Sequence, residues 1–281
     1  MVLDGATAVL ATRHGKERAI APVLERALGL RVEATAAVDT DQLGTFAGDV
    51  PRRGSPLETA RLKARAGLAA RRDVDWALAS EGTLGPHPAS PFAIADDELV
   101  VLLHRRLPIE VVGRHLALPP LFDGECVRSA AEGLDCAERL GFPVYGVIVT
   151  GAHEGRRAPA RGVFKDVRTC QDVWRAVGEL IAEHGEAWVE TDARADRNPA
   201  RMQAIAKAAE HLAGRARQRC PLCAAPGFVV VETMAGLPCH ACGEPTPSAR
   251  GETSACWSCG HRSTFAQSGD ASPGECSLCN P

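Results

Sequence analysis

The sequence has 281 residues, of which 45% are hydrophobic and 24% are charged, and its formal net charge is −3. These proportions are typical of a soluble globular protein with one large or two modest domains. The weak net charge argues against general attraction to nucleic acid or anionic membranes. No apolar run approaches the roughly 20 residues that a membrane span needs. Residues 1–12 lack the basic and apolar regions of a signal peptide, so we expect a cytoplasmic protein.

The first part of the chain predicts strands alternating with helices. Residues 6–12 predict a strand, and residues 16–29 predict a helix that ends at a glycine. A short strand near residues 30–34 and a polar, glycine-rich loop over residues 39–54 follow. Ser55 and Glu58 then form a capping-box pattern, which opens a second helix running to about residue 70.

The same alternation continues to about residue 214. Apolar runs and capping patterns predict strands at 74–80, 98–104 and 109–116, a helix at 129–140, strands at 145–150 and 162–167, a helix at 170–184, a strand at 187–191 and a helix at 198–217. We therefore predict an α/β domain over residues 1–214, in which a mixed sheet carries helices on both faces and makes three layers. Residues 215–281 are short of apolar side chains and rich in cysteine, which predicts a separate small zinc-binding domain.

One acidic residue stands out in the stretch ALASEGTLGPHP, residues 77–88. Glu81 is expected where an apolar strand opens into a loop rich in glycine and proline. Ligands of open α/β sheets bind outside the carboxyl ends of the strands, so Glu81 is a candidate functional residue. The alternative is a turn carboxylate that hydrogen-bonds to its own backbone. For His87, between two prolines, a rigid-loop role is favoured over contact with a nucleotide base.

Eight of the eleven cysteines form four C-x-x-C pairs after residue 219. In a chain without a recognisable export signal, this spacing indicates metal ligation rather than disulfides. Two such turns supply the four thiolates of one tetrahedral zinc site, so four turns predict two structural Zn²⁺ sites. The pairs could combine in sequence order, as two zinc ribbons, or in an interleaved order. The eight ligands would be Cys220, Cys223, Cys239, Cys242, Cys256, Cys259, Cys276 and Cys279.

The charged and aromatic residues of the tail indicate which class of partner it can bind. From Arg215 onward there are five arginines, five acidic residues and no lysine. Only three aromatic side chains could stack on bases, at Phe228, Trp257 and Phe265. This composition is a poor match for nucleic-acid binding. We therefore expect the tail to have a structural role or to contact a protein partner.

The segment TRHGK, residues 12–16, joins the first predicted strand to the first predicted helix. Backbone N–H groups and the helix dipole at such a position favour phosphate, and Lys16 adds a full positive charge. Loops of this kind are common in α/β proteins, so the pattern is weak when taken alone. Glu58 has a simpler explanation as well, since the capping box already accounts for it.

Taken together, these stretches resemble the pyrophosphatases that act on non-standard purine nucleoside triphosphates, the inosine/xanthosine triphosphatase group. That family has a Thr…Lys phosphate loop, then a glutamate-bearing helix similar to ETARLKARAGLAA, then an apolar strand ending in an acidic turn as in ALASEGTL. ETDARADRNPARM lies where the family carries a nucleotide-holding loop and helix, although the family's final Ser-His-Arg signature is absent. The whole chain also resembles an uncharacterised bacterial family with a paired C-x-x-C tail.

The resemblance implies hydrolysis of a nucleoside triphosphate to the monophosphate and pyrophosphate. Glu58 and Glu81 would hold Mg²⁺, which orients water at the α-phosphorus, and Asp192 or Asp196 would bind metal or activate the water. Lys16, the loop backbone and Arg194 or Arg197 would stabilise the developing charge. The implied catalytic residues are Glu81, Glu58, Lys16 and Asp192, and the implied nucleotide-binding residues are Thr12, Arg13, His14, Gly15, Lys16, His87, Arg194 and Arg197.

A second hypothesis is a non-catalytic nucleotide sensor, or a protein-interaction module that docks through its tail. The two hypotheses differ in what they expect of the acids. Glu58 and Glu81 pointing into one cleft with Lys16 would favour the enzyme, whereas a cleft in which either acid is satisfied by internal arginines would favour the sensor. In either case the expected partner is a nucleotide or another phosphorylated small molecule.

Overall fold

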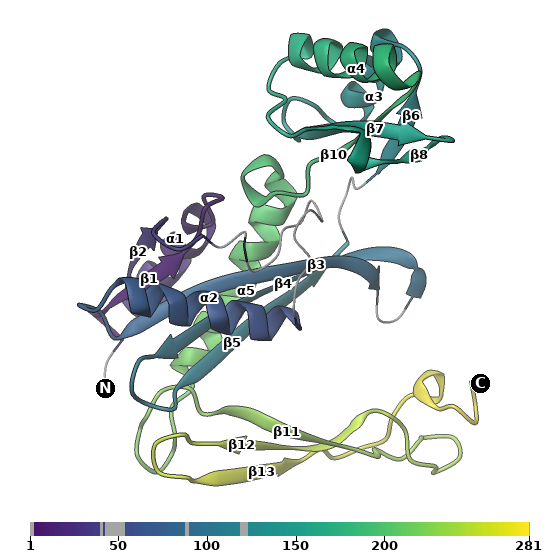
Figure 1. Cartoon of the computed structure of the whole chain (residues 1–281). Coiled ribbons are helices and arrows are strands. Elements are labelled where there is room, and N and C mark those ends of the chain that lie inside the picture. Colours follow the sequence, from purple (N-terminus) through teal and green to yellow (C-terminus); the bar gives the residue numbers. More distant parts are fainter. Residues whose placement is uncertain (1–2, 40–41, 43–53, 88–89, 119–122, 281) are drawn as a thin grey trace.

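The computed structural model describes the whole chain except residues 1–2, 40–41, 43–53, 88–89, 119–122 and 281 (Figure 1). Most of the predicted loop over residues 39–54 lies outside the described part. The main sheet has five strands, and β1 is parallel to β2 and β3, whereas β3, β4 and β5 are antiparallel. In sheet order the strands are β2 (Arg31–Thr35), β1 (Thr7–Ala11), β3 (Trp76–His87), β4 (Ser90–His104) and β5 (Glu110–Ala117).

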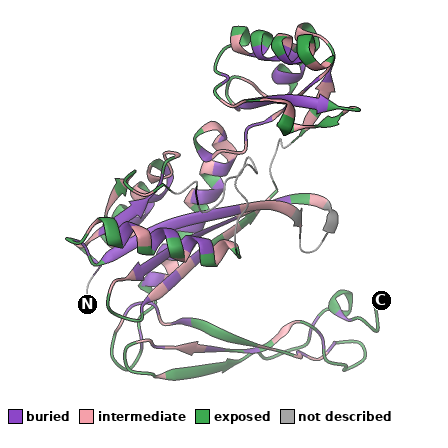
Figure 2. Ribbon diagram, viewed as in Figure 1, coloured by how far each residue is buried: buried purple, intermediate pink, exposed green. Residues whose placement is uncertain are grey.

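Helices cover both faces of this sheet (Figure 2). Side chains alternate across a strand, so Leu78 and Val100 pack with α1 (Glu17–Leu28) and α5 (Pro199–Arg217). Their neighbours Ala77 and Val101 pack on the other side with α2 (Pro56–Ala70). The predicted mixed α/β class is therefore confirmed.

The helix boundaries follow the sequence patterns. Ser55 accepts a hydrogen bond from the backbone N–H of Glu58 at 3.3 Å, and its own N–H donates to the Glu58 carboxylate at 2.8 Å. Asn198 caps α5 through the N–H of Arg201. Gly29 ends α1 in the left-handed conformation, with φ of 65°, which a glycine adopts without steric cost.

Residues 124–191 form a second lobe with a sheet of its own (Figure 1). Its strands are β6 (Gly124–Val127), β7 (Val147–His153), β8 (Arg156–Arg157), β9 (Val163–Phe164) and β10 (Ala187–Thr191), and its helices are α3 (Ala130–Arg139) and α4 (Cys170–His184). Val149, Val177 and Val189 belong to a separate core between them. We predicted one sheet for residues 1–214, but alternating strands and helices look alike in sequence whether they build one sheet or two.

The tail leaves α5 and forms a three-stranded antiparallel sheet. Its strands are β11 (Val229–Ala235), β12 (Ala249–Ala255) and β13 (Arg262–Ala266). Loops at both ends of this sheet carry the C-x-x-C turns. Within the described residues, no helix combines the length and apolar character that crossing a membrane requires.

Candidate functional site

The main sheet changes direction at the carboxyl end of β1. The connection through α1 leads to β2 on one side, whereas α2, on the opposite face, leads to β3 on the other side. On β3, the residues that pair with β1 are Trp76–Leu78, and β3 continues past them to His87. Open α/β sheets bind ligands at such a switch point. The loop over residues 12–16 and the middle of β3 meet there.

Glu81 lies inside β3 rather than at a strand end. We expected the strand to stop near residue 80, but β4 pairs with β3 through Glu81↔Leu99 and beyond. The Glu81 side chain points to the α2 face and is buried. It accepts a hydrogen bond from Lys63 Nζ at 2.6 Å, and Lys63 is also buried. Glu81 is therefore half of a buried ion pair.

Two further buried acids lie on the α1/α5 face of the same sheet. Asp96 and Glu98 are two residues apart on β4, so their side chains point the same way. Arg201 of α5 donates from Nε to Glu98 Oε1 at 2.9 Å, and the same Nε lies 3.7 Å from Asp96 Oδ1. Burial and then the negative charge of Glu98 raise the pKa of Asp96 to about 7, although Arg201 opposes the shift. This face therefore carries two close carboxyl groups and one guanidinium.

Lys16 lies next to acids of both faces. Its Nζ is 3.5 Å from the carbonyl oxygen of Ser80, on the part of β3 that β1 does not cover. Burial lowers the pKa of Lys16, while the nearby charges of Glu98 and Glu81 act to raise it. Three cationic and three acidic side chains thus meet around the switch point, namely Lys16, Lys63, Arg201, Glu81, Asp96 and Glu98. Shifted pKa values such as those of Lys16 and Asp96 cluster at functional sites.

The structure explains why a glycine, Gly82, follows Glu81 in the stretch ALASEGTLGPHP. It pairs with Glu98 across the strands, and a Cβ built on Gly82 would lie 2.5 Å from Glu98 Oε1. The Glu98 carboxylate therefore lies directly over the glycine, where any larger residue would displace it.

We predict that Gly82→Ala destabilises the protein by about 1–3 kcal/mol, because the added methyl forces the Glu98–Arg201 pair to move. Gly85→Ala in the same strand is the matched control, since a Cβ there would meet no atom of the described residues within 4 Å. Urea unfolding of both variants measures the difference. Equal stability of the two variants would show that the pair accommodates the methyl.

The structure does not bring Glu58 into this cluster. Glu58 is exposed, its carboxylate accepts hydrogen bonds from Ser55 at 2.8 Å, and those bonds lower its pKa. It lies on α2 with Lys63, but Lys63 faces the sheet and Glu58 does not. The contacts of Glu58 are those of a helix cap, which is the simpler explanation given above.

The predicted site residues of the stretch ETDARADRNPARM are held mainly by one another. Asp192 is fully buried and accepts from Arg194 Nε at 3.0 Å, and Arg197 Nε lies 4.0 Å from the same carboxylate. Arg197 also donates to the Val167 carbonyl at 2.9 Å. Thus Asp192, Arg194 and Arg197 link the segment between β10 and α5 to the second lobe.

The loop over residues 12–16 does lie at the switch point. Thr12 is buried at the end of β1, and α1 begins at Lys16 without a side-chain cap. His14 Nδ1 is 3.5 Å from Asp196, and Arg13 pairs with Asp39 at 2.6 Å. Gly15 has φ of 64°. His87 ends β3, five residues beyond Gly82 along the hairpin with β4.

Four members of the cluster were missed from the sequence, for three different reasons. Asp96 and Glu98 precede or begin the apolar run LVVLL, so they read as a solvated strand end. Lys63 occupies the inward face of a helix, where lysine is rarely buried unless paired. Arg201 lies 103 residues from Glu98. The alternation of Asp96 and Glu98 around Asp97 is the signal that could have placed two acids on one face.

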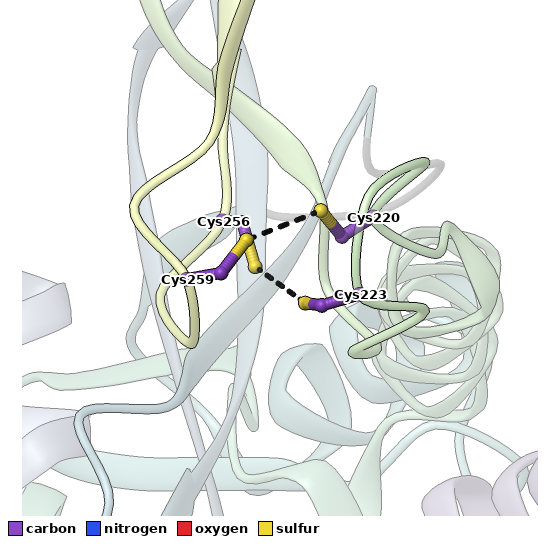
Figure 3. Close-up of side chains that lie close together, drawn as sticks. All are labelled: Cys220, Cys223, Cys256 and Cys259. Atoms are coloured by element: carbon purple, nitrogen blue, oxygen red, sulfur yellow. Dashed lines mark hydrogen bonds between the residues drawn. The ribbon is translucent and has the colours of Figure 1, made fainter.

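The cysteine pairs combine in the interleaved order, the second of the two arrangements left open above. Cys220 and Cys223 meet Cys256 and Cys259 (Figure 3). The other set is Cys239, Cys242, Cys276 and Cys279. Because β11, β12 and β13 connect the turns, each set takes one turn from before β12 and one from after it.

The geometry of both sets suits a tetrahedral metal ion. In the first set, Cys220 and Cys259 sulfurs lie 3.7 Å apart, and Cys223 and Cys256 sulfurs lie 3.6 Å apart. The corresponding distances in the second set are 3.9 and 3.7 Å. Four thiolates at about 2.3 Å from one zinc ion would be roughly 3.8 Å apart. The two sets therefore fit two zinc sites.

Backbone N–H groups support the first set. The N–H of Leu222 points to the Cys220 sulfur at 3.4 Å, and that of Ser258 points to the Cys256 sulfur at 3.3 Å. Such bonds favour the thiolate form, which metal binding requires. The first cysteine of every pair is buried and the second is exposed.

A profile described as a domain of unknown function, DUF6671, matches residues 65–281. The chain belongs to this DUF6671 family. The matched region contains Glu81, Asp96, Glu98, Arg201 and both cysteine sets, and it begins after Lys16 and Lys63. Membership agrees with the resemblance to an uncharacterised family with a paired C-x-x-C tail.

Two other comparisons add little to the DUF6671 assignment. No curated protein matches the chain. Among solved structures, protein VC0702 from Vibrio cholerae is similar with a TM-score of 0.34 and 10% sequence identity, covering 74% of this chain and 92% of that protein. A likeness at this level does not bear on function.

Proposed function

We propose that the switch-point cluster hydrolyses nucleoside triphosphates to the monophosphate and pyrophosphate. The observation that carries the proposal is the meeting of three buried acids with Lys16, Lys63 and Arg201 where the sheet changes direction. Burying a charged group costs free energy unless a partner or ligand compensates it. The resemblance of TRHGK and ALASEGTL to nucleotide pyrophosphatases supplies the reaction class.

The proposed roles follow from the positions of these groups. Lys16 and the uncapped first turn of α1 bind the phosphates, because the ammonium group and the helix dipole both favour negative charge. Glu81, oriented by Lys63, would orient the attacking water beside β3. A bound Mg²⁺ ion would neutralise part of the negative charge of the triphosphate. Glu58 has no role in this proposal.

The test is a screen of the purified, zinc-loaded chain against standard and damaged nucleoside triphosphates. Pyrophosphate release is measured in Mg²⁺ and again with the Mg²⁺ omitted. Release from at least one nucleotide, only with the cation present, supports the proposal. Absence of release across the panel would overturn it.

A nucleotide sensor is the second candidate, and one observation favours it. Glu81 is paired with Lys63 and Glu98 with Arg201, so two of the three acids already have internal partners. The sensor predicts that the protein binds a triphosphate without turning it over. Calorimetric titration alongside the screen separates the two candidates.

We expect Lys16→Ala to weaken pyrophosphate binding on the order of tenfold, which corresponds to about 1.4 kcal/mol. The melting temperature should change little, because the lysine is partly desolvated and its removal relieves that cost. Arg18→Ala is the matched control, since Arg18 is an exposed cation two residues further along the same helix. Affinity is measured by calorimetry at low salt. Equal affinity of Lys16→Ala and wild type would exclude a phosphate-binding loop here.

For the tail we propose that each cysteine set holds one structural Zn²⁺. The tail exposes most of its strand residues and cannot bury enough apolar surface to fold unaided. Zinc binding would contribute folding free energy on the order of 10 kcal/mol per site. Elemental analysis of the purified chain should give two zinc ions per chain.

A further inference from the structure

Strand β13 leaves one edge of the tail sheet open within the part of the chain that the structure describes. It pairs with β12 on one side, and all five of its residues are exposed. Figure 1 shows it at the outer edge of the tail. The N–H and C=O groups of such an edge can pair with a strand of another chain.

The hydrogen bonds to β12 determine which backbone groups of β13 face outward. The N–H of Gln267, just after β13, donates to the carbonyl oxygen of Arg250 at 2.9 Å. Groups that face the neighbouring strand recur at every second residue of an antiparallel strand, so those of Ser263 and Phe265 also face β12. The residues whose N–H and C=O groups point away from the sheet are Arg262, Thr264 and Ala266.

The opposite edge of the same sheet is protected, and the β13 edge is not. Strand β11 has two register shifts against β12, and Arg215 of α5 donates to its Val230 carbonyl at 3.5 Å. Bulges and covering side chains are two of the ways in which proteins block pairing at a sheet edge. Strand β13 pairs with β12 without a register shift and contains neither proline nor lysine. The β13 edge is therefore the one that another strand can use.

The sequence of β13 is complementary to itself when a second copy runs antiparallel to it. With Thr264 opposite Thr264 of the second copy, Arg262 lies opposite Ala266, and every outward N–H and C=O group of the strand gains a partner. The two arginines then lie at opposite ends of the paired strands, and each has Glu232 of its own chain at 3.0 Å. A register centred on Arg262 would instead place two like charges opposite each other, which is unfavourable.

The side chains on both faces of the sheet suit the same register. The hydroxyl oxygens of Thr253 and Thr264 lie 3.0 Å apart, so pairing would continue this row of threonines into the second copy. Phe265 lies on the other face and is 72% exposed. Its ring would lie beside Ser263 of the second copy, whose small side chain leaves room for it. Pairing would therefore cover an aromatic ring that the single chain leaves in water.

We propose that two copies of the chain associate through β13, antiparallel and centred on Thr264, so that their tail sheets become one continuous sheet. The same strand contributes from both copies, so the contact closes as a twofold dimer. A contact of one short strand is small, and we expect weak, reversible association rather than a permanent dimer. The proposal does not depend on the reaction proposed for the switch point, because β13 belongs to the tail.

The test is sedimentation equilibrium of the full-length, zinc-loaded protein over a series of concentrations, with amide hydrogen exchange measured on the same samples. We expect a monomer–dimer equilibrium. Exchange of the Thr264 N–H should slow as the dimer forms, because this group points away from β12 in the single chain and donates to the second copy in the dimer.

Two substitutions at Thr264 test the register. Thr264→Pro removes the central outward donor, and a proline is tolerated at a sheet edge where the N–H faces solvent. Thr264→Lys places two like charges opposite each other and leaves the backbone donor in place. Each should raise the dissociation constant of the dimer on the order of tenfold or more, while elemental analysis still gives two zinc ions per chain. Thr233→Lys, at an exposed threonine of β11, is the matched control and should leave the dissociation constant unchanged.

The wild-type measurements decide the proposal even if a variant folds poorly. A chain that stays monomeric up to millimolar concentration would overturn it and leave this edge to a strand of another protein. A dimer in which the Thr264 N–H exchanges as fast as in the monomer would also overturn it, because the contact would then lie elsewhere. The same conclusion would follow from a folded Thr264→Lys protein that dimerises as tightly as the wild type.

Discussion

Cys220→Ser is expected to lower the stability of the main domain as well as that of the tail, whereas Cys239→Ser is expected to disturb the tail alone. The first cysteine set lies against the body of the protein. Trp257, between Cys256 and Cys259, packs on the core shared by α1, α5 and the main sheet, and its Nε1 donates to the Pro226 carbonyl at 2.7 Å. The second set includes Cys276 and Cys279, which lie next to the C-terminal end of the tail.

The magnitudes follow from what each variant removes. Each serine should cost one zinc ion per chain, and with it most of the folding free energy of the adjoining turns, on the order of 10 kcal/mol. Releasing Trp257 from the core should cost the main domain a further 2–3 kcal/mol, roughly. At about 2–4 °C per kcal/mol, Cys220→Ser should therefore lower the main melting transition by several degrees. Calorimetry with zinc analysis measures both effects.

Cys170→Ser is the control, because Cys170 is exposed and belongs to neither set. It should retain two zinc ions and the wild-type transition. If Cys220→Ser and Cys239→Ser leave the main transition equally unchanged, the tail folds independently of the body. That result would mean that the Trp257 contact contributes little to the core.

The parts of the fold that were predictable are those set by local chemistry. Ser55 and Glu58 determine the start of α2 through bonds three residues apart, and Gly29 determines the end of α1. The C-x-x-C turns likewise place two thiolates together whatever surrounds them. Such patterns need no knowledge of distant contacts.

The parts that were not predictable depend on distant partners. Glu81 lies within a strand because β4 extends the pairing past residue 80, and nothing in ALASEGTLGPHP reveals that. Arg201 meets Glu98 only through the packing of α5 on the sheet. The interleaving of the cysteine sets depends on the antiparallel order of β11, β12 and β13. The spacing of the pairs along the chain is compatible with either order.

The buried pair between Glu81 and Lys63 offers the sharpest test of whether the switch point catalyses a reaction. Glu81→Gln removes one charge and leaves Lys63 buried without its ionic partner, which should cost about 3–5 kcal/mol of stability. If Glu81 also stabilises the transition state by about 4 kcal/mol, hydrolysis should slow roughly 10³-fold. A loss of stability alone does not distinguish a catalytic acid from a structural one, so a second substitution is needed.

Combining Glu81→Gln with Lys63→Met makes that distinction. Methionine replaces the unpaired ammonium group with an apolar side chain of similar length, so the double variant should regain most of the lost stability. A catalytic Glu81 predicts that hydrolysis stays about 10³-fold slow in the refolded double variant. A purely structural pair predicts that activity returns with stability. Glu110→Gln, which breaks the more exposed pair with Arg61, controls for the general effect of losing a carboxylate and should cost at most about 1 kcal/mol. Recovery of wild-type turnover in the double variant would remove Glu81 from the catalytic residues and leave the sensor as the better account of this site.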